Sequence, residues 1–246
     1  MVATGTIINV ITVVVGGTLG VLLGARLPQR MRETIMHALG LLTAVIGVQL
    51  SLETGNILIV LGSLLVGGII GEGLRIETLI DRLGQWLQRR SGAGVAEEAA
   101  SPPPGSPAGG TRFRHAFLTT SLLFCVGPMT ILGSIQDGLT GDYTLLAIKS
   151  TMDGFAALAF AASLGPGVIF SALTVLVFQG ALTLGAGWAD AVLSESMVVE
   201  MTATGGVLML ALALGLLKIK RIRVGNLLPA LLLAPIIVAL FDALSR

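Results

Sequence analysis

Long uncharged runs of apolar residues constrain this chain more than any other feature of its sequence. Several runs approach the roughly 20 residues that an α-helix needs to cross the hydrocarbon core of a bilayer. Charged residues make up only 12% of the chain, about half the fraction of a soluble domain, whose surface must be solvated. The sequence therefore predicts an all-α integral membrane protein with several transmembrane helices.

About eight spans are predicted. The first apolar run is not read as a cleavable signal, because no basic segment precedes it and further spans follow directly. The predicted spans are 5–24, 35–52, 56–72, 116–133, 143–163, 167–186, 201–217 and 224–241. Hydropathy alone leaves the ends of the short third and fourth spans open by several residues.

The basic residues predict the orientation of these spans. With eight spans, thirteen of the fifteen Lys and Arg residues fall in loops on one side, in 25–34, 73–115 and 218–223. Acidic residues fall in the other loops: Glu53, Asp137, Asp142, Asp190 and Glu195. Because cytoplasmic loops carry an excess of Lys and Arg, both termini are predicted to face outward.

The long loop between the third and fourth spans has two parts. In residues 75–90, apolar side chains recur at helical spacing opposite Arg and Asp, which predicts an amphipathic helix on the inner leaflet. Residues 91–112 contain the sequence SPPPGSPAGG, whose prolines and glycines predict a disordered linker. A plain tether and a regulatory segment both fit this composition.

The first and sixth spans resemble each other. Residues 5–25 align with 167–187 at a constant offset, with six identical pairs. We therefore predict two three-span repeats, 1–74 and 165–246, around a central hairpin at 113–164. Because the first span would run inward and the sixth outward, the repeats would be inverted, as in many secondary transporters. Convergent composition of membrane helices is the alternative explanation.

Small residues recur every four positions on two spans. They are Gly16, Gly20 and Gly24 on the first span, and Ser63, Gly67 and Gly71 on the third. Such stripes allow two helix backbones to approach closely. They predict close packing within one subunit or, alternatively, a homodimer interface.

Two charged residues lie inside the fifth predicted span. Lys149 and Asp153 are four positions apart, so they share one helix face and can form an ion pair. Each charge would cost about 2.5–3.5 kcal/mol at the bilayer centre. The pair must therefore face the bundle interior or a water-filled cavity, where it serves either as a binding site or only as a fixed structural pair.

The preceding span contains a Gly-Pro break, and non-helical backbone at this depth is tolerated only beside protein or water. Polar residues on the first and sixth spans, including Thr12 and Thr174, could line the same cavity. The predicted solute- or ion-binding residues are Lys149, Asp153, Ser150, Gly127, Pro128, Ser134, Gln136, Asp137, Asp142, Asn9, Ser171 and Gln179.

The remaining reactive residues give no catalytic or metal-binding pattern. Cys125 is the only cysteine, and it is read as a small core residue. His37 and His115 lie at span edges without a second ligand at metal-binding spacing, and HExxH and GxSxG motifs are absent. We expect no enzyme activity, no cofactor and no nucleic-acid partner.

Two segments resemble a known family: GTIIN at residues 5–9 and GPMTILGSIQDGLTGDYTLLAIKSTMDGFAAL at residues 127–158. They resemble the YqgA/YdfK-like family, domain of unknown function 554. The resemblance covers the chain apart from residues 91–111. It implies a multi-pass protein of the bacterial plasma (inner) membrane and carries over no site residues.

These features together favour a secondary transporter of a small polar or anionic solute, coupled to protons or sodium. In that reading Asp153 binds the ion and Lys149 is its counter-ion. A channel with the same polar lining is an alternative, and a non-transporting structural or assembly protein is another. The expected partners are the lipid bilayer and the solute, with a homodimer through the glycine faces as an option.

Overall fold

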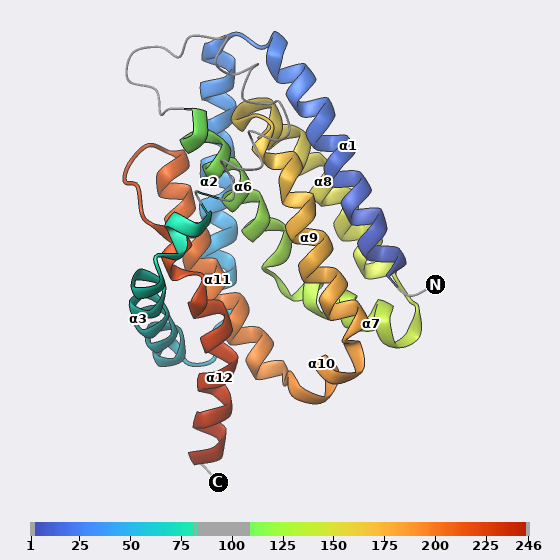
Figure 1. The fold of residues 1–246 in the computed structure, drawn as a ribbon, viewed down its shortest axis with the longest axis vertical. Helices are drawn as coiled ribbons and strands as arrows, with labels where there is room; N and C mark the ends of the chain where they lie inside the picture. Colours follow the sequence, from blue (N-terminus) through green and yellow to red (C-terminus); the bar gives the residue numbers. More distant parts are fainter. Residues whose placement is uncertain (1–2, 81, 83–108, 245–246) are drawn as a thin grey trace.

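A computed structural model describes residues 3–80, 82 and 109–244, and all regular secondary structure in these ranges is helical (Figure 1). The helices are α1 (Thr4–Arg26), α2 (Gln29–Ser51), α3 (Ile57–Leu74), α6 (Gly109–Cys125), α7 (Pro128–Thr140), α8 (Thr144–Leu164), α9 (Gly167–Leu184), α10 (Ala186–Val192), α11 (Glu195–Leu216), the 3-10 helix η1 (Val224–Leu227) and α12 (Pro229–Leu244).

Seven segments in the described ranges are long and apolar enough to cross a membrane. A further pair, α6 and α7, passes the same test together but is bent by 59°. Counting this pair as one span gives eight, and the prediction of an all-α protein with about eight transmembrane helices is confirmed. α1 runs upward from the N-terminus and α12 runs downward to the C-terminus (Figure 1).

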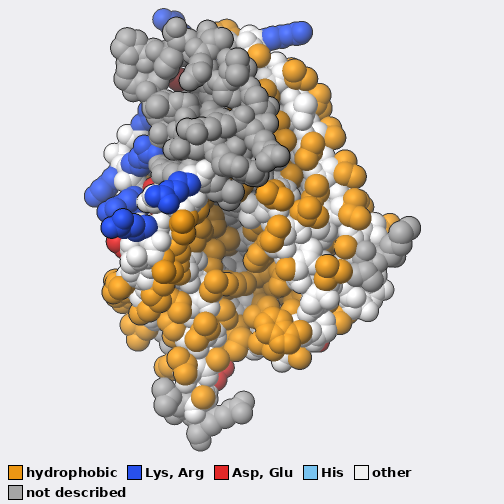
Figure 2. Space-filling model, in the orientation of Figure 1, with side chains coloured by type: hydrophobic (Ala, Val, Ile, Leu, Met, Phe, Trp, Pro, Cys, Tyr) orange, Lys and Arg blue, Asp and Glu red, His pale blue; other side chains and the backbone are white. Residues whose placement is uncertain are grey.

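The surface divides into a basic end and an apolar body. Lys and Arg side chains gather at the upper left of the face in Figure 2, above a surface that is mainly hydrophobic. Large apolar side chains stay exposed on several helices, among them Leu22, Ile69 and Leu232. A soluble protein rarely exposes contiguous apolar surface of this extent, so the exposed helix faces are suited to lipid.

The first glycine stripe packs α1 against α8. Methyl groups added at Gly16, Gly20 and Gly24 would overlap carbonyl oxygens of α8 at residues 154, 158 and 162. The offset is the same at all three glycines, so the two helices run parallel and in register. The second stripe is covered by η1 and α12, because an added methyl group at Gly71 would overlap the carbonyl of Asn226. Association of two copies would therefore need other helix faces.

The helices that the predicted repeat relates pack against each other in antiparallel pairs. Thr6 and Thr183 meet at one end of the α1–α9 pair, and Gly17 and Ile169 meet toward its other end. α2 with α11 and α3 with α12 form the other two pairs. Of the remaining helices, α8 lies along α1, and α6 and α7 lie along α9. In an inverted repeat, corresponding helices run in opposite directions. The repeat itself stays a prediction.

Two predicted spans begin earlier in the structure than hydropathy placed them. α2 begins at Gln29 instead of residue 35, which brings Arg32 into the helix. The Arg32 guanidinium donates to the carbonyl of Gly24 and so satisfies an acceptor at the end of α1. α11 begins at Glu195 instead of residue 201, because Ser194 caps its N-terminus through the backbone N–H of Met197 at 3.3 Å.

Two further boundaries differ from the prediction. The fourth span, predicted over 116–133 with a Gly-Pro break, consists of α6 and α7, which are separated at that break because Pro128 lacks the N–H that would continue α6, and α7 continues to Thr140. The linker was predicted to end at residue 112, but α6 already begins at Gly109. Of the amphipathic helix predicted at 75–90, residues 76–80 and 82 are helical, and the rest lies outside the described residues, as does most of the linker.

Candidate functional site

Lys149 and Asp153 form an ion pair on the inward face of α8. The Lys149 ammonium donates to Oδ2 of Asp153 one helical turn away, and each side chain is only 9% exposed. Residues four apart on a helix lie on the same face, so both charges can point away from lipid together. The high cost of lipid-facing charge explains this orientation: the pair lies in the interior of the bundle.

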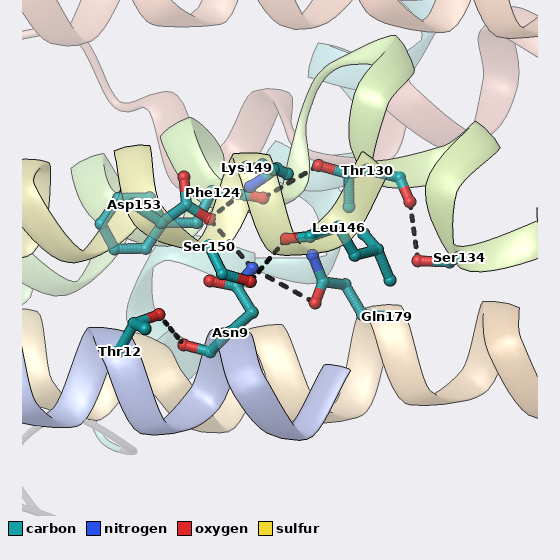
Figure 3. A network of polar contacts seen from close by, with 10 residues as sticks. All are labelled: Asn9, Thr12, Phe124, Thr130, Ser134, Leu146, Lys149, Ser150, Asp153 and Gln179. Carbon is teal, nitrogen blue, oxygen red and sulfur yellow. Dashed lines mark hydrogen bonds and ion pairs between the residues drawn. The ribbon is translucent and has the colours of Figure 1, made fainter. Parts of the chain in front are cut away.

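Two amide side chains complete the cluster (Figure 3). Asn9 of α1 donates from Nδ2 to Oδ2 of Asp153 at 3.0 Å. The same nitrogen lies 3.2 Å from Oε1 of Gln179 on α9. Both amides are fully buried, and the antiparallel packing of α1 on α9 brings them together. We call Asn9, Lys149, Asp153 and Gln179 the central polar cluster.

The cluster has hydrogen-bonding capacity that its own members do not use. Oδ1 of Asn9 and Nε2 of Gln179 are buried and have no partner. Buried polar atoms without a partner are rare, and each one calls for an explanation such as a bound water, ion or ligand. The cluster therefore keeps one free acceptor and one free donor beside the ion pair.

The break between helices α6 and α7 lies next to the central polar cluster. α6 ends at Cys125, and Figure 3 shows Phe124 of α6 and Thr130 of α7 close to Lys149. Gly127 has a φ of 144°, a value that favours glycine, and a side chain added there would meet no atom within 4 Å. The break thus lies beside open space.

One side chain bridges the break. The hydroxyl of Thr130 on α7 donates to the carbonyl of Phe124 on α6 at 3.1 Å (Figure 3). The carbonyl end of α6 carries partial negative charge and the amino end of α7 partial positive charge. Two helix ends of opposite polarity therefore meet inside the bundle near the ion pair.

Three predicted site residues are buried but use their hydroxyl protons within their own helices. Ser134, Ser150 and Ser171 donate to the carbonyls of Thr130, Leu146 and Val168, each at 2.6 Å. These hydrogen bonds satisfy the three hydroxyl groups within the apolar interior, and none of the serines joins the central polar cluster. Thr12 likewise donates to the carbonyl of Asn9, whereas Thr174 accepts from Ser121 at 3.0 Å.

Two other predicted residues lie outside the cluster, at the surface. Gln136 is exposed and donates to Oδ2 of Asp142 at 3.1 Å. Asp142 also accepts from the backbone N–H and the hydroxyl of Thr144 at the start of α8. These hydrogen bonds from Thr144 hold the pKa of Asp142 below its ordinary value. That Gln136 and Asp142 bind a solute or an ion stays a prediction.

Asp137, predicted to lie in a loop, belongs to α7 and is buried against the start of α1. It has no exposed surface, and its Oδ2 accepts the backbone N–H of Gly5 at 3.0 Å. It therefore satisfies one of the free N–H groups at a helix N-terminus. Its other oxygen, Oδ1, has no partner.

One buried carboxylate, Glu200 of α11, was missed from the sequence. It is 3% exposed and accepts from the hydroxyl of Thr54 and from the backbone N–H groups of Gly55 and Asn56 at 2.7–2.9 Å. Glu200 fixes the α2–α3 loop to α11, which is a structural role.

Comparisons with known proteins give a family and no activity. A family profile described as "Protein of unknown function (DUF554)" matches residues 4–239. The chain is 35% identical over 237 residues to the "Uncharacterized protein YqgA" of Escherichia coli (strain K12), with 94% of each chain covered. It is 27% identical over 243 residues to the "Uncharacterized membrane protein YdfK" of Bacillus subtilis (strain 168), with 97% of each covered. No solved structure matches significantly.

Proposed function

The chain belongs to the DUF554 family of proteins of unknown function, and we propose that it is a secondary transporter of a small polar or anionic solute. The observation that carries this proposal is the enclosed Lys149–Asp153 pair beside a broken helix. Charges inside a membrane bundle typically mark ion and solute pathways. Broken helices near the midplane expose backbone groups to the ligands of many transporters.

The electrostatics of the pair suggest how two ligands would be coupled. Removing one partner of a buried ion pair costs about 3–5 kcal/mol, because the other charge is left uncompensated. A proton or sodium ion that neutralises Asp153 would therefore leave Lys149 in need of an anion. Binding of the cation and of an anionic solute would favour each other.

The unpaired amide atoms supply the remaining contacts in this scheme. Nε2 of Gln179 could donate to a carboxylate or phosphate oxygen, and Oδ1 of Asn9 could accept from a hydroxyl or ammonium group. Because the pair is nearly inaccessible to solvent, the structure corresponds in this proposal to an occluded conformation. The antiparallel helix pairs would then allow the site to open toward either side in turn.

The proposal includes an orientation in the bacterial inner membrane. Basic loops at one end of the bundle would face the cytoplasm, and both termini would face outward. The proposed solute would then enter from the outer side, near α7 and the start of α1.

Transport by the full-length protein in liposomes tests this function. Vesicles adsorbed on an electrode would receive acetate, lactate, glutamate or phosphate under an inward sodium or proton gradient. A carrier gives currents that saturate with solute concentration and depend on the gradient. The result that contradicts the proposal is an absence of protein-dependent current with every solute and gradient in this panel.

The same measurement separates the two alternatives. A channel with the same lining gives flux that neither saturates nor couples to an ion gradient. For a structural or assembly protein, substitution of Lys149 or Asp153 lowers the amount of folded protein and no flux is observed. The exposed ion pair between Arg223 and Glu72 provides a control, because its loss should affect neither flux nor abundance.

A further inference from the structure

A second group of buried oxygen atoms lies about one helical turn from the central polar cluster. Asp137 is its only charged member. Its carboxylate has no exposed surface, accepts one backbone hydrogen bond from Gly5, and forms no ion pair within the described ranges. An ionised carboxylate is costly to bury without a countercharge, and the partial charge at the N-terminus of α1 offsets only a fraction of that cost.

Two threonines lie on the helix segments that contact α7 at Asp137 and its neighbour Gly138. Thr6 follows Gly5 directly, and its Oγ1 lies 3.3 Å from Oγ1 of Thr183. Thr183 is also held against α7, because a methyl group added at Gly138 would overlap its carbonyl oxygen. Residues 137 and 138 of α7 therefore contact both threonine-bearing segments, and both threonines are only 1% exposed.

The group is continuous with the central polar cluster. Asn9 is three residues beyond Thr6 on α1, about 4.5 Å along the helix axis. Gln179 is four residues before Thr183 on the antiparallel α9, about 6 Å along its axis. Oδ1 of Asn9, like Oδ1 of Asp137, is a buried acceptor with no partner. A column of oxygen atoms thus runs from Asp137 to Asp153.

The donor set selects a class of ligand. Carboxylate, hydroxyl and amide oxygens are ligands for hard cations, and dedicated divalent sites commonly use several carboxylates. In the described part of the chain, no group of three His, Cys, Asp or Glu residues could hold a metal ion. One buried carboxylate with neutral oxygens around it is suited to a single positive charge.

We propose that Asp137 binds a sodium ion together with the hydroxyls of Thr6 and Thr183 and Oδ1 of Asn9. Binding supplies the countercharge for the carboxylate and uses the two unpartnered acceptors. The ion's part in driving transport rests on the function proposed above, whereas its binding does not. The two ideas can therefore fail separately.

The test uses a tryptophan near the site. The chain has two tryptophans, and Trp86→Phe leaves only Trp188, which is exposed on α10, a helix packed against α7. The purified full-length variant in detergent is titrated with NaCl, with choline chloride keeping the ionic strength constant. We expect a saturable change in Trp188 fluorescence and a rise in the unfolding temperature with sodium concentration, because a ligand of the folded state stabilises it.

Substitutions assign the signal to the site. Asp137→Asn should abolish the sodium response, while Asp190→Asn, on the exposed face of α10, should leave it intact. Thr6→Val and Thr183→Val should each weaken sodium affinity by at least about tenfold, the order of loss when a supporting partner of a metal site is removed. If Asp137→Asn does not fold, the two threonine variants carry the test.

Three results would overturn the proposal. One is the absence of a sodium response in the parent protein, which would leave water as the occupant of the group. Another is a response of equal size with choline or potassium. The third is an unchanged sodium affinity in Asp137→Asn or in both threonine variants. Sodium binding without any solute-dependent current would refute transport and leave the site standing.

Discussion

Nδ2 of Asn9 lies 3.0 Å from Oδ2 of Asp153, across 144 positions of sequence. The contact connects α1 to the middle of α8, and the same nitrogen reaches Gln179 on α9. The two helices can approach this closely because the glycine stripe of α1 places its backbone against α8. Helix packing and the polar cluster therefore depend on each other.

Loss of the Asn9 amide should destabilise the bundle. Asn9→Ala removes a donor to a buried carboxylate, which costs about 1.5–3 kcal/mol for a bond to a charged group. The unfolding temperature in detergent measures the effect. Thr18→Ala is the matched control on α1, because its exposed hydroxyl bonds only to the carbonyl of Val14 in its own helix. Equal effects from the two variants would refute this role of Asn9.

The ion pair should show strong energetic coupling. Lys149→Met or Asp153→Asn alone leaves the other buried charge without its partner, which should lower the unfolding free energy by about 3–5 kcal/mol. The double variant removes both charges and should be less destabilised than the sum of the two single variants. A double-mutant cycle on unfolding free energies measures the difference. Simple additivity would mean that the two charges do not interact.

The glycine stripe should tolerate no added methyl group. Gly16→Ala would overlap the carbonyl of Gly154, and overpacking of a tight interface costs about 1–3 kcal/mol. Gly180→Ala on α9 is the control, because a side chain there meets no atom within 4 Å. Unfolding temperatures of the two variants should differ clearly. If Gly16→Ala is as stable as the control, α1 does not pack on α8 as described.

The two ends of the bundle should react differently in intact cells. Cys125 is the only cysteine, so Cys125→Ala provides a background for single new cysteines. Ser194→Cys lies on the α10–α11 loop and Lys220→Cys on the α11–α12 loop, at opposite ends of α11. A membrane-impermeant maleimide should label the first and not the second. Labelling of Lys220→Cys but not of Ser194→Cys would show that the proposed orientation is wrong.

Much of the fold could be predicted because a bilayer imposes simple demands. Apolar runs of span length must be helices, and basic loops share one side. The burial of Lys149 and Asp153 followed from the cost of lipid-facing charge. Window averages of hydropathy, however, do not locate the end of a span that is bent at a break, so the fourth span was predicted to end at 133 although α7 continues to Thr140. Hydropathy also assigns charged residues to loops, which is why Glu200 was missed.

The membership of the cluster was harder to predict than its existence. Asn9 and Gln179 were candidates, and the structure brings them to the ion pair. Ser171 was a candidate on the same grounds, yet its hydroxyl donates to the carbonyl of Val168. The choice between a neighbouring helix and the residue's own backbone depends on side-chain rotamers, which sequence spacing does not encode.

The central claim is that Asp153 takes part in solute movement. Its most direct test is the initial rate of uptake into liposomes, measured against concentration for whichever solute of the panel gives a current. The account predicts a saturable rate that Asp153→Asn lowers at least about 100-fold, a loss of roughly 2.7 kcal/mol, while Glu72→Gln leaves it unchanged. An undiminished rate with Asp153→Asn, at equal amounts of folded protein per vesicle, would contradict it.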